Sequence, residues 1–245
     1  FEIDPVAVFD RLGHLGVSGL DLDGLVPSSE RTFTYGQNAL TRHRESFDFP
    51  SLARPGTFVV ELVGGGVSSR AVVRKGTLHL VGRLTEAGHV FRALDEDRAV
   101  VRDAILRFGG RDYLSDDGGE LFVPFSTGGG RRTALLRRGD LAVVTAFDHV
   151  TEDYALEAAV FAPGEALVSG SSATFTVRPR LTVAGVRASL ELLQDASLVV
   201  TSTDLDGARS TKVVPLEGVD AGAILTADVD RKSTRLNSSH TVISY

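Results

Sequence analysis

The histidines are the first residues of this chain whose chemistry could bind a metal ion or carry a proton. Outside the C-terminal tail they are His14, His43, His79, His89 and His149. No two of them have the His-x3-His spacing that would bring two imidazoles to one zinc ion. His79 and His89 fall in predicted strands and could face each other, but a structural role is favoured over ligation. The sequence therefore predicts no metal site built on histidine and no cofactor.

Two acidic turns are the next candidates for metal binding. Each has the pattern Asp-Leu-Asp-Gly, beginning at Asp21 and at Asp204. Two carboxylates before a glycine could begin a calcium loop, but the later glutamate and the intervening oxygen ligands of an EF-hand are missing. The pattern favours ordinary acidic turns and leaves four weak calcium candidates: Asp21, Asp23, Asp204 and Asp206.

No set of residues in the chain indicates catalysis. There is no cysteine, and the serine pairs at Ser28, Ser68 and Ser171 lie in predicted turns without the Gly-x-Ser-x-Gly elbow of a hydrolase. Asp116 and Asp117 are adjacent in a turn, where two carboxylates are ordinarily just solvated. We therefore predict no catalytic residue and no enzyme activity.

Paired arginines flank one predicted strand and could form a basic ridge. Arg131-Arg132 and Arg137-Arg138 lie on either side of Leu135-Leu136. The ridge could contact an acidic neighbouring domain or a polyanion. Solvation is the favoured interpretation, because charged side chains on strand edges discourage aggregation.

Composition limits the class of protein. The 245 residues are 42% hydrophobic and 24% charged, with a net charge of −6 and no cysteine. This is the composition of globular domains held together by hydrophobic cores rather than disulfides. Acidic net charge argues against a nucleic-acid partner, and no apolar run is long enough to span a membrane.

Short strands separated by glycine-rich turns dominate the pattern, and the stretch from Thr77 to Phe147 shows it best. A strand over 103–108 is followed by Gly109-Gly110 and a returning strand over 111–114. A two-residue glycine turn between apolar runs is the strongest short-range hairpin signal. About seven strands in about 70 residues are typical of a small β-sandwich.

The same pattern extends on both sides. Strands are predicted at Arg31–Tyr35, Glu45–Phe49, Thr57–Val63 and Ser69–Arg74, and later at Tyr154–Phe161, Ala173–Arg178, Arg180–Val183, Ser197–Thr203 and Thr211–Val214. Alternation places one set of side chains in the cores: Phe58, Val60, Leu62, Ile105, Phe122, Val143, Phe175 and Val199. A short N-terminal helix is predicted over Pro5–Leu12.

The predicted fold class is all-β, with antiparallel sandwiches in series. The expected divisions are an N-terminal linker or the end of a preceding domain (1–28), a partial sandwich (29–76), a complete sandwich (77–149) and a truncated sandwich (150–229). Residues 230–245 resemble a translated sequencing adapter, so we expect this tail to be an artefact. With no methionine, the chain is expected to be an internal fragment.

The run Arg54-Pro-Gly-Thr-Phe-Val-Val-Glu61, a glycine turn and then Ser68 to Gly76 resemble bacterial alpha-2-macroglobulin-like proteins. The stretch containing Ala104, Tyr113 and Val123-Pro124 is similar to a transthyretin-like or carboxypeptidase-regulatory sandwich. The resemblance implies serial immunoglobulin-like or macroglobulin-type domains and an extracellular or periplasmic location. The family's Cys-x-x-Gln thioester is absent, since there is no cysteine.

The expected function is a non-catalytic spacer and protein-interaction scaffold within a large secreted or periplasmic protein. Its partners would be neighbouring domains of the same chain and other proteins, proteases among them. Two alternatives stay open: a carbohydrate-binding or adhesin module, and an accessory β-domain of an extracellular enzyme. The absence of tryptophan counts against the sugar-binding alternative.

Overall fold

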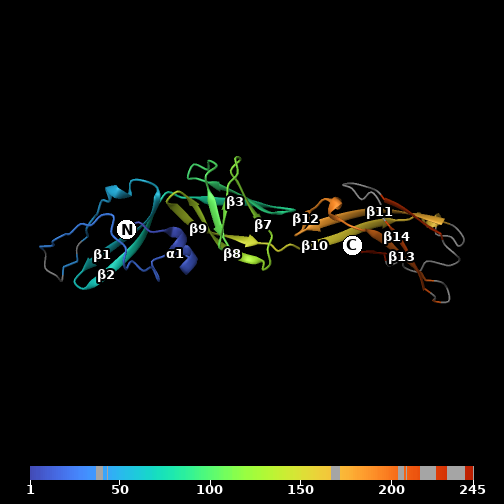
Figure 1. The fold of residues 1–245 in the computed structure, drawn as a ribbon, viewed down its shortest axis with the longest axis horizontal. Helices are drawn as coiled ribbons and strands as arrows, with labels where there is room; N and C mark the ends of the chain where they lie inside the picture. Colours follow the sequence, from blue (N-terminus) through green and yellow to red (C-terminus); the bar gives the residue numbers. More distant parts are fainter. Residues whose placement is uncertain are drawn as a thin grey trace. The chain divides into compact units, whose positions relative to one another are not determined.

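Short antiparallel strands form nearly all of the regular structure (Figure 1). The computed structural model describes residues 1–36, 41–42, 44–166, 172–203, 207, 209–215, 225–230 and 241–244. The chain divides into two units, Phe1–Val150 and Thr151–Tyr245. The predicted all-β class is confirmed, and so is the short N-terminal helix.

That helix, α1 (Pro5–Leu12), begins and ends at residues suited to those positions. The Asp4 carboxylate caps the first turn by accepting a hydrogen bond of 2.9 Å from the Val6 N–H. Pro5 occupies the first position, where its missing N–H costs nothing. Gly13 ends the helix in the left-handed conformation with a φ of 72°.

The described residues of the first unit form nine strands and one 3₁₀ turn, η1 (Pro50–Leu52). The strands are β1 (Gly56–Gly64), β2 (Val67–Lys75), β3 (His79–Thr85), β4 (Gly88–Leu94), β5 (Ile105–Phe108), β6 (Arg111–Leu114), β7 (Glu120–Pro124), β8 (Gly130–Arg138) and β9 (Leu141–His149). β1 and β2 form a separate hairpin. The other seven form two sheets, in the orders β3-β4-β7 and β6-β5-β8-β9.

The predicted hairpin at Gly109-Gly110 is confirmed. Phe108 pairs with Arg111, so these two glycines alone form the loop between β5 and β6. Their φ angles are 57° and 76°, the left-handed region that a type I′ turn requires at both positions. The next turn, at Asp116–Gly119, has a different role. It carries the chain from β6 in one sheet to β7 in the other.

The four-stranded sheet of the first unit is covered on both faces. Leu136 belongs to the core between the two sheets, whereas its neighbour Leu135 belongs to a second core on the opposite face. That second core contains Val8 of α1 and Val59 of β1. Adjacent residues of β8 are therefore both fully buried, as expected for a strand enclosed on both sides rather than one with a solvated face.

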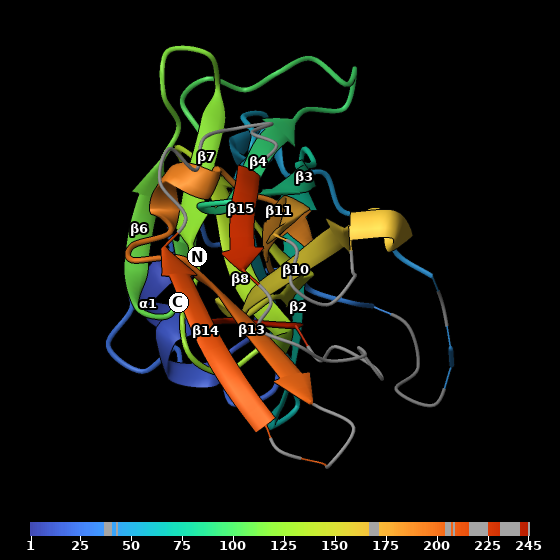
Figure 2. The same ribbon diagram turned by 90° about the vertical axis from the view of Figure 1, so that its right-hand side faces the viewer.

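The second unit contains two further sheets. Its strands are β10 (Tyr154–Phe161), β11 (Ser172–Val183), β12 (Val186–Arg187), β13 (Ser197–Thr203), β14 (Arg209–Pro215), β15 (Leu225–Asp230) and β16 (Thr241–Ser244), with 3₁₀ turns η2 (Gly164–Ala166) and η3 (Leu190–Leu192). β11 pairs with β10, β12 and β15, while β13 pairs with β14 and β16. Figure 2 shows β13 and β14 side by side.

Pro179 does not interrupt its strand, contrary to the prediction of two separate strands there. β11 runs continuously through it, paired with β10. On the other edge of β11, β15 pairs with residues 172–177 and β12 with residues 182–183. Pro179 lies between those two segments, so its missing N–H can face an edge with no partner strand among the described residues.

Several local predictions are wrong. Arg31–Tyr35 and Glu45–Phe49 are not strands in the structure. Leu62 and Phe122, expected in the core, are 55% and 46% exposed. In β7 the buried residues are Leu121 and Val123, so the predicted alternation was shifted by one residue. A shift of one residue transfers every side chain to the opposite face of a strand.

Candidate functional site

A pair of buried histidines lies in the core of the first unit. His89 comes from β4 and His149 from the end of β9, so the two sheets of the sandwich each contribute one ring. The ring centroids are 5.1 Å apart. Phe91, Phe108 and Phe147 pack around them. The sequence did not indicate this pair, because 60 residues separate its members and neither has a recognisable motif.

Both histidines are held in the neutral form. Burial is the main cause that lowers the pKa of His89, and the nearby His149 lowers it further. Burial and then the charge of Arg132 lower the pKa of His149. His89 Nε2 accepts a hydrogen bond of 3.2 Å from the Val150 N–H, and His149 Nε2 lies 2.7 Å from Ser126 Oγ. With two of the four ring nitrogens engaged by the protein, the pair is arranged for packing rather than for metal binding.

The pairing of His79 with His89 considered in the sequence is not formed. His79 pairs with Leu94, and His89 pairs with Leu84, at opposite ends of the β3–β4 hairpin. His14 Nδ1 accepts a hydrogen bond of 3.0 Å from the Gly16 N–H in a turn. His43 lies outside the described residues.

The acidic turns show the geometry of ordinary turns where they are described. Asp21 Oδ1 accepts a hydrogen bond of 2.9 Å from the Asp23 N–H. Asp204 and Asp206 lie outside the described residues. Within the described part of the chain, no group of three or more histidine, aspartate or glutamate side chains could hold a metal ion. Calcium binding by these turns stays a prediction.

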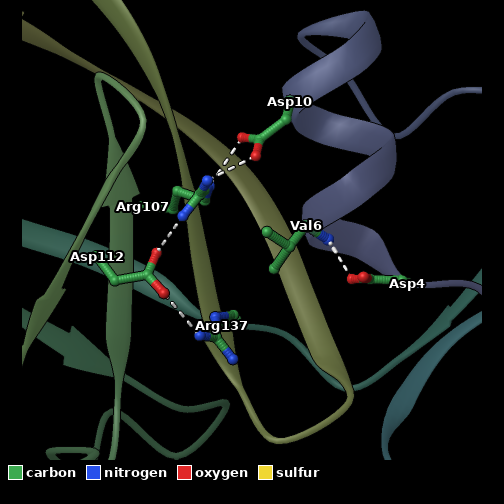
Figure 3. A network of polar contacts seen from close by, with 6 residues as sticks. All are labelled: Asp4, Val6, Asp10, Arg107, Asp112 and Arg137. Carbon is green, nitrogen blue, oxygen red and sulfur yellow. Dashed lines mark hydrogen bonds and ion pairs between the residues drawn. The ribbon is translucent and has the colours of Figure 1, made fainter.

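A network of charges joins α1 to the four-stranded sheet (Figure 3). Arg107 of β5 donates from Nε and Nη2 to the two carboxylate oxygens of Asp10, at 2.8 and 2.6 Å. Its Nη1 donates to Asp112 of β6 at 2.9 Å, and Arg137 of β8 donates to the other Asp112 oxygen at 3.0 Å. Two carboxylates and two guanidinium groups thus fix the helix on the sheet.

The network keeps its members charged. The hydrogen bond from Arg107 lowers the pKa of Asp10. Burial opposes ionisation of Asp112, but hydrogen bonds from Arg107 and Arg137 outweigh it and lower the pKa of that carboxyl. Hydrogen bonds to Asp10 and then Asp112 raise the pKa of Arg107 above its usual range.

Each of the paired arginines considered as a basic ridge has a polar partner, and three of the four contact a carboxylate. Arg137 contacts Asp112, Arg138 contacts Asp103 at 2.9 Å, and Arg131 contacts Asp148 at 3.6 Å. Arg132 donates to the Gly128 carbonyl at 2.7 Å. These partners leave little free positive charge for a polyanion.

A groove of about 600 Å³ opens where the end of β2 meets the edges of β3 and β9. It is lined by Arg74, Gly76, Thr77, Leu78, His79, Leu80, Val143, Val144 and Thr145. His79 and Leu80 of β3 and Val143, Val144 and Thr145 of β9 supply most of this lining. Within the described residues, no helix combines the length and apolar character needed to span a bilayer.

Comparisons with known proteins point to one kind of domain. Residues 1–76 match the family model of the AbpF first immunoglobulin-like domain, and residues 163–230 match that of the AbpF third immunoglobulin-like domain. The chain therefore contains immunoglobulin-like domains, and these two segments are similar to those of AbpF. No solved structure matches the chain.

A curated relative covers most of the chain. Actin-binding protein F of Dictyostelium discoideum is 32% identical over 211 residues, which is 83% of this chain and 9% of the relative. The chain therefore spans only a small part of the relative's length. The two segments that match family models are together shorter than the 211 aligned residues. The similarity to the relative therefore also includes the sandwich formed by β3 to β9, which lies between those segments in the sequence.

These matches overturn the resemblance drawn from the sequence. The chain is not similar to bacterial alpha-2-macroglobulin-like proteins but to a Dictyostelium protein named for binding actin. The expected bacterial, secreted, extracellular or periplasmic setting is wrong for the same reason, since actin belongs to the cytoskeleton. The turn residues and alternation that suggested macroglobulin domains are common to β-sandwiches of many families, which is why they misled.

Proposed function

We propose that this chain is a non-catalytic protein-interaction segment of a cytoskeletal actin-binding protein. The observation that carries the proposal is the 32% identity over 211 residues to Actin-binding protein F. Filamentous actin is the first partner to test. The cytoplasm is the expected location of such a protein.

The structure supports an interaction role through its surfaces. Within each unit, short antiparallel strands provide a framework whose edges and loops can contact other proteins. His89 and His149, the histidines that lie close enough together to act as a pair, are packed among phenylalanines. Both features favour binding over catalysis.

We also propose that three domains follow one another along the chain. The first and third domain models flank residues 77–162, and the seven strands β3–β9 occupy most of that interval. We propose that they form the sandwich between the two matched domains. The tail 230–245 is retained in the proposal as an adapter-like artefact; the third domain model ends at residue 230.

Co-sedimentation with filamentous actin tests the function. The purified chain is centrifuged with increasing actin, and a sandwich protein of equal net charge serves as the control. We expect saturable pelleting of the chain that depends on actin. A chain that stays folded and remains in the supernatant at every actin concentration would contradict actin binding by this segment and leave it a spacer.

A further inference from the structure

Among the described residues, strand β9 has no backbone partner on its outer edge from Val144 onward, while Thr57 occupies the beginning of that edge. It is the last strand of the order β6-β5-β8-β9, paired with β8 on one side. Its residues from Leu141 to Phe147 include no charged side chain and no proline, and its one charged residue, Asp148, lies near the end of the strand. Natural sheets usually protect exposed edges with such residues, because unpaired backbone groups attract other strands.

The other three edges of this sandwich carry that protection. β6 is four residues long and contains Arg111 and Asp112. β7 contains Glu120 and ends at Pro124. β3 contains Arg83. The contrast identifies β9 as the edge of the sandwich that is left open to pairing.

Hydrogen bonds at the start of β9 show which of its residues face outward. The Ala142 N–H donates to Thr57 Oγ1 at 3.3 Å, and the Thr57 hydroxyl donates to the Ala142 carbonyl at 3.4 Å. Both backbone groups of Ala142 therefore point away from β8. Because this direction alternates along an antiparallel strand, Val144 and Ala146 also point their N–H and C=O groups outward. Within the described residues, neither has a backbone partner on that side.

The groove beside this edge is lined mainly by polar groups, with a few apolar side chains and a basic end. Leu80 and Val143 are half-buried and pack against the sandwich core. The side chains of Arg74 and Lys75 are exposed at the end of β2, and within the described part of the chain neither side chain forms an ion pair or hydrogen bond. A guest strand would thus find backbone donors and acceptors, two apolar side chains to pack against, and positive charge.

We propose that an extended acidic segment of a partner protein binds here by adding as an antiparallel strand to β9. Val144 and Ala146 form the main-chain hydrogen bonds, which supply affinity in this mode of recognition. Alternate apolar side chains of the segment pack on Leu80 and Val143. Its carboxylates contact Arg74 and Lys75. The proposal extends the protein-interaction role, but it does not require that the partner be actin.

Binding is measured with a fluorescein-labelled octapeptide that alternates valine with glutamate, and with a matched peptide that has lysine in place of glutamate. The full chain should bind the glutamate peptide saturably and the lysine peptide at least about tenfold more weakly, a factor that a few charge contacts supply. Ala146→Pro removes an outward N–H at an edge position that tolerates proline, and should weaken binding by about tenfold or more.

The charge contribution is tested with a matched pair of double variants. Arg74→Glu with Lys75→Glu should weaken binding of the glutamate peptide. Arg180→Glu with Arg187→Glu makes the same change of charge on exposed residues of the second unit and should leave binding unchanged. Equal effects of the two double variants would overturn the assigned basic end.

Amide hydrogen exchange of the unchanged chain locates the peptide independently of any variant. Added glutamate peptide should protect the amides of Val144 and Ala146 and leave those of β6 unaffected. Protection elsewhere only, or no binding, would refute the proposal. Self-association through β9 without peptide binding would also refute it, and would assign the edge to a second copy of the chain. Neither result depends on the outcome of the actin experiment.

Discussion

His89 and His149 are histidines used as core residues. They are 5% and 2% exposed, and their rings pack against phenylalanines from both sheets. His149 Nδ1 is buried without a hydrogen-bonding partner among the described residues. A proton added to either ring would place a charge in an apolar setting, so protonation must be opposed by the fold.

This opposition predicts a loss of stability in mild acid. Both pKa values are lowered from the usual 6.5, so the unfolded chain binds more protons than the folded chain once the pH falls below about 6.5. The stability present above that pH should therefore decrease as the pH falls toward the lowered values. Urea midpoints at pH 7.5 and 5.0 measure the effect.

His89→Phe keeps an aromatic ring in the cluster and removes one of the two titrations, so its midpoint should change less between these pH values. An unchanged pH dependence would contradict the assignment. Asp10 and Asp112 do not interfere, because their arginine partners lower the pKa of each carboxyl, so their contribution is lost only in stronger acid.

Arg107 is the residue on which the helix–sheet network depends, since it contacts both Asp10 and Asp112. Arg107→Leu should lower the free energy of unfolding, because it leaves two partly covered carboxylates without that partner. Arg131→Leu is the control: Arg131 and Asp148 are 69% and 76% exposed, and exposed pairs contribute little. Chemical denaturation compares the two. Equal losses would mean that the network has no special role.

At the scale of elements, the sequence predicted strands well and their orientation poorly. Gly109-Gly110 correctly predicted a hairpin, because glycine turn chemistry is local. Which of two neighbouring residues in a strand faces the core depends on distant parts of the chain, so the local sequence did not show it. Ile105 and Val199 were expected in the cores, yet their neighbours Leu106 and Leu198 are the fully buried residues. In a strand such as β5, where both neighbours are apolar, the sequence alone does not show which face is enclosed.

The candidate sites also depend on contacts between distant residues, which the sequence does not show. α1 could be predicted from its helical spacing, but nothing in the sequence showed that Asp10 would contact Arg107, 97 positions later. The histidine pair and the β9 groove likewise arise from strands that are distant in the chain. Residue types defined the possible chemistry, and strand pairing decided which residues met.

Gly82 in β3 provides a prediction about packing between strands. It pairs with Phe91 of β4, and a Cβ at this position would lie 2.2 Å from Phe91 Cδ1. Gly82→Ala must displace a buried ring, so it should reduce the free energy of unfolding by about 1–3 kcal/mol. Gly64→Ala, at a strand position with nothing within 4 Å of the added Cβ, should have much less effect. Thermal denaturation of both variants tests the difference, and similar changes in Tm would contradict it.

At the scale of the whole molecule, the chain contains separate cores in its two units. Leu106 lies in the sandwich core of Phe1–Val150, and Leu198 lies in a core of Thr151–Tyr245. Each is fully buried. The two units therefore offer a matched pair of leucines through which the stability of each can be changed by the same substitution.

We expect calorimetry of the full chain to show two unfolding transitions. Leu106→Ala should lower the temperature of one and Leu198→Ala that of the other, each by removing about 2–5 kcal/mol from its own unit through a core cavity. If instead each substitution moved both transitions together, the units would unfold as one cooperative body.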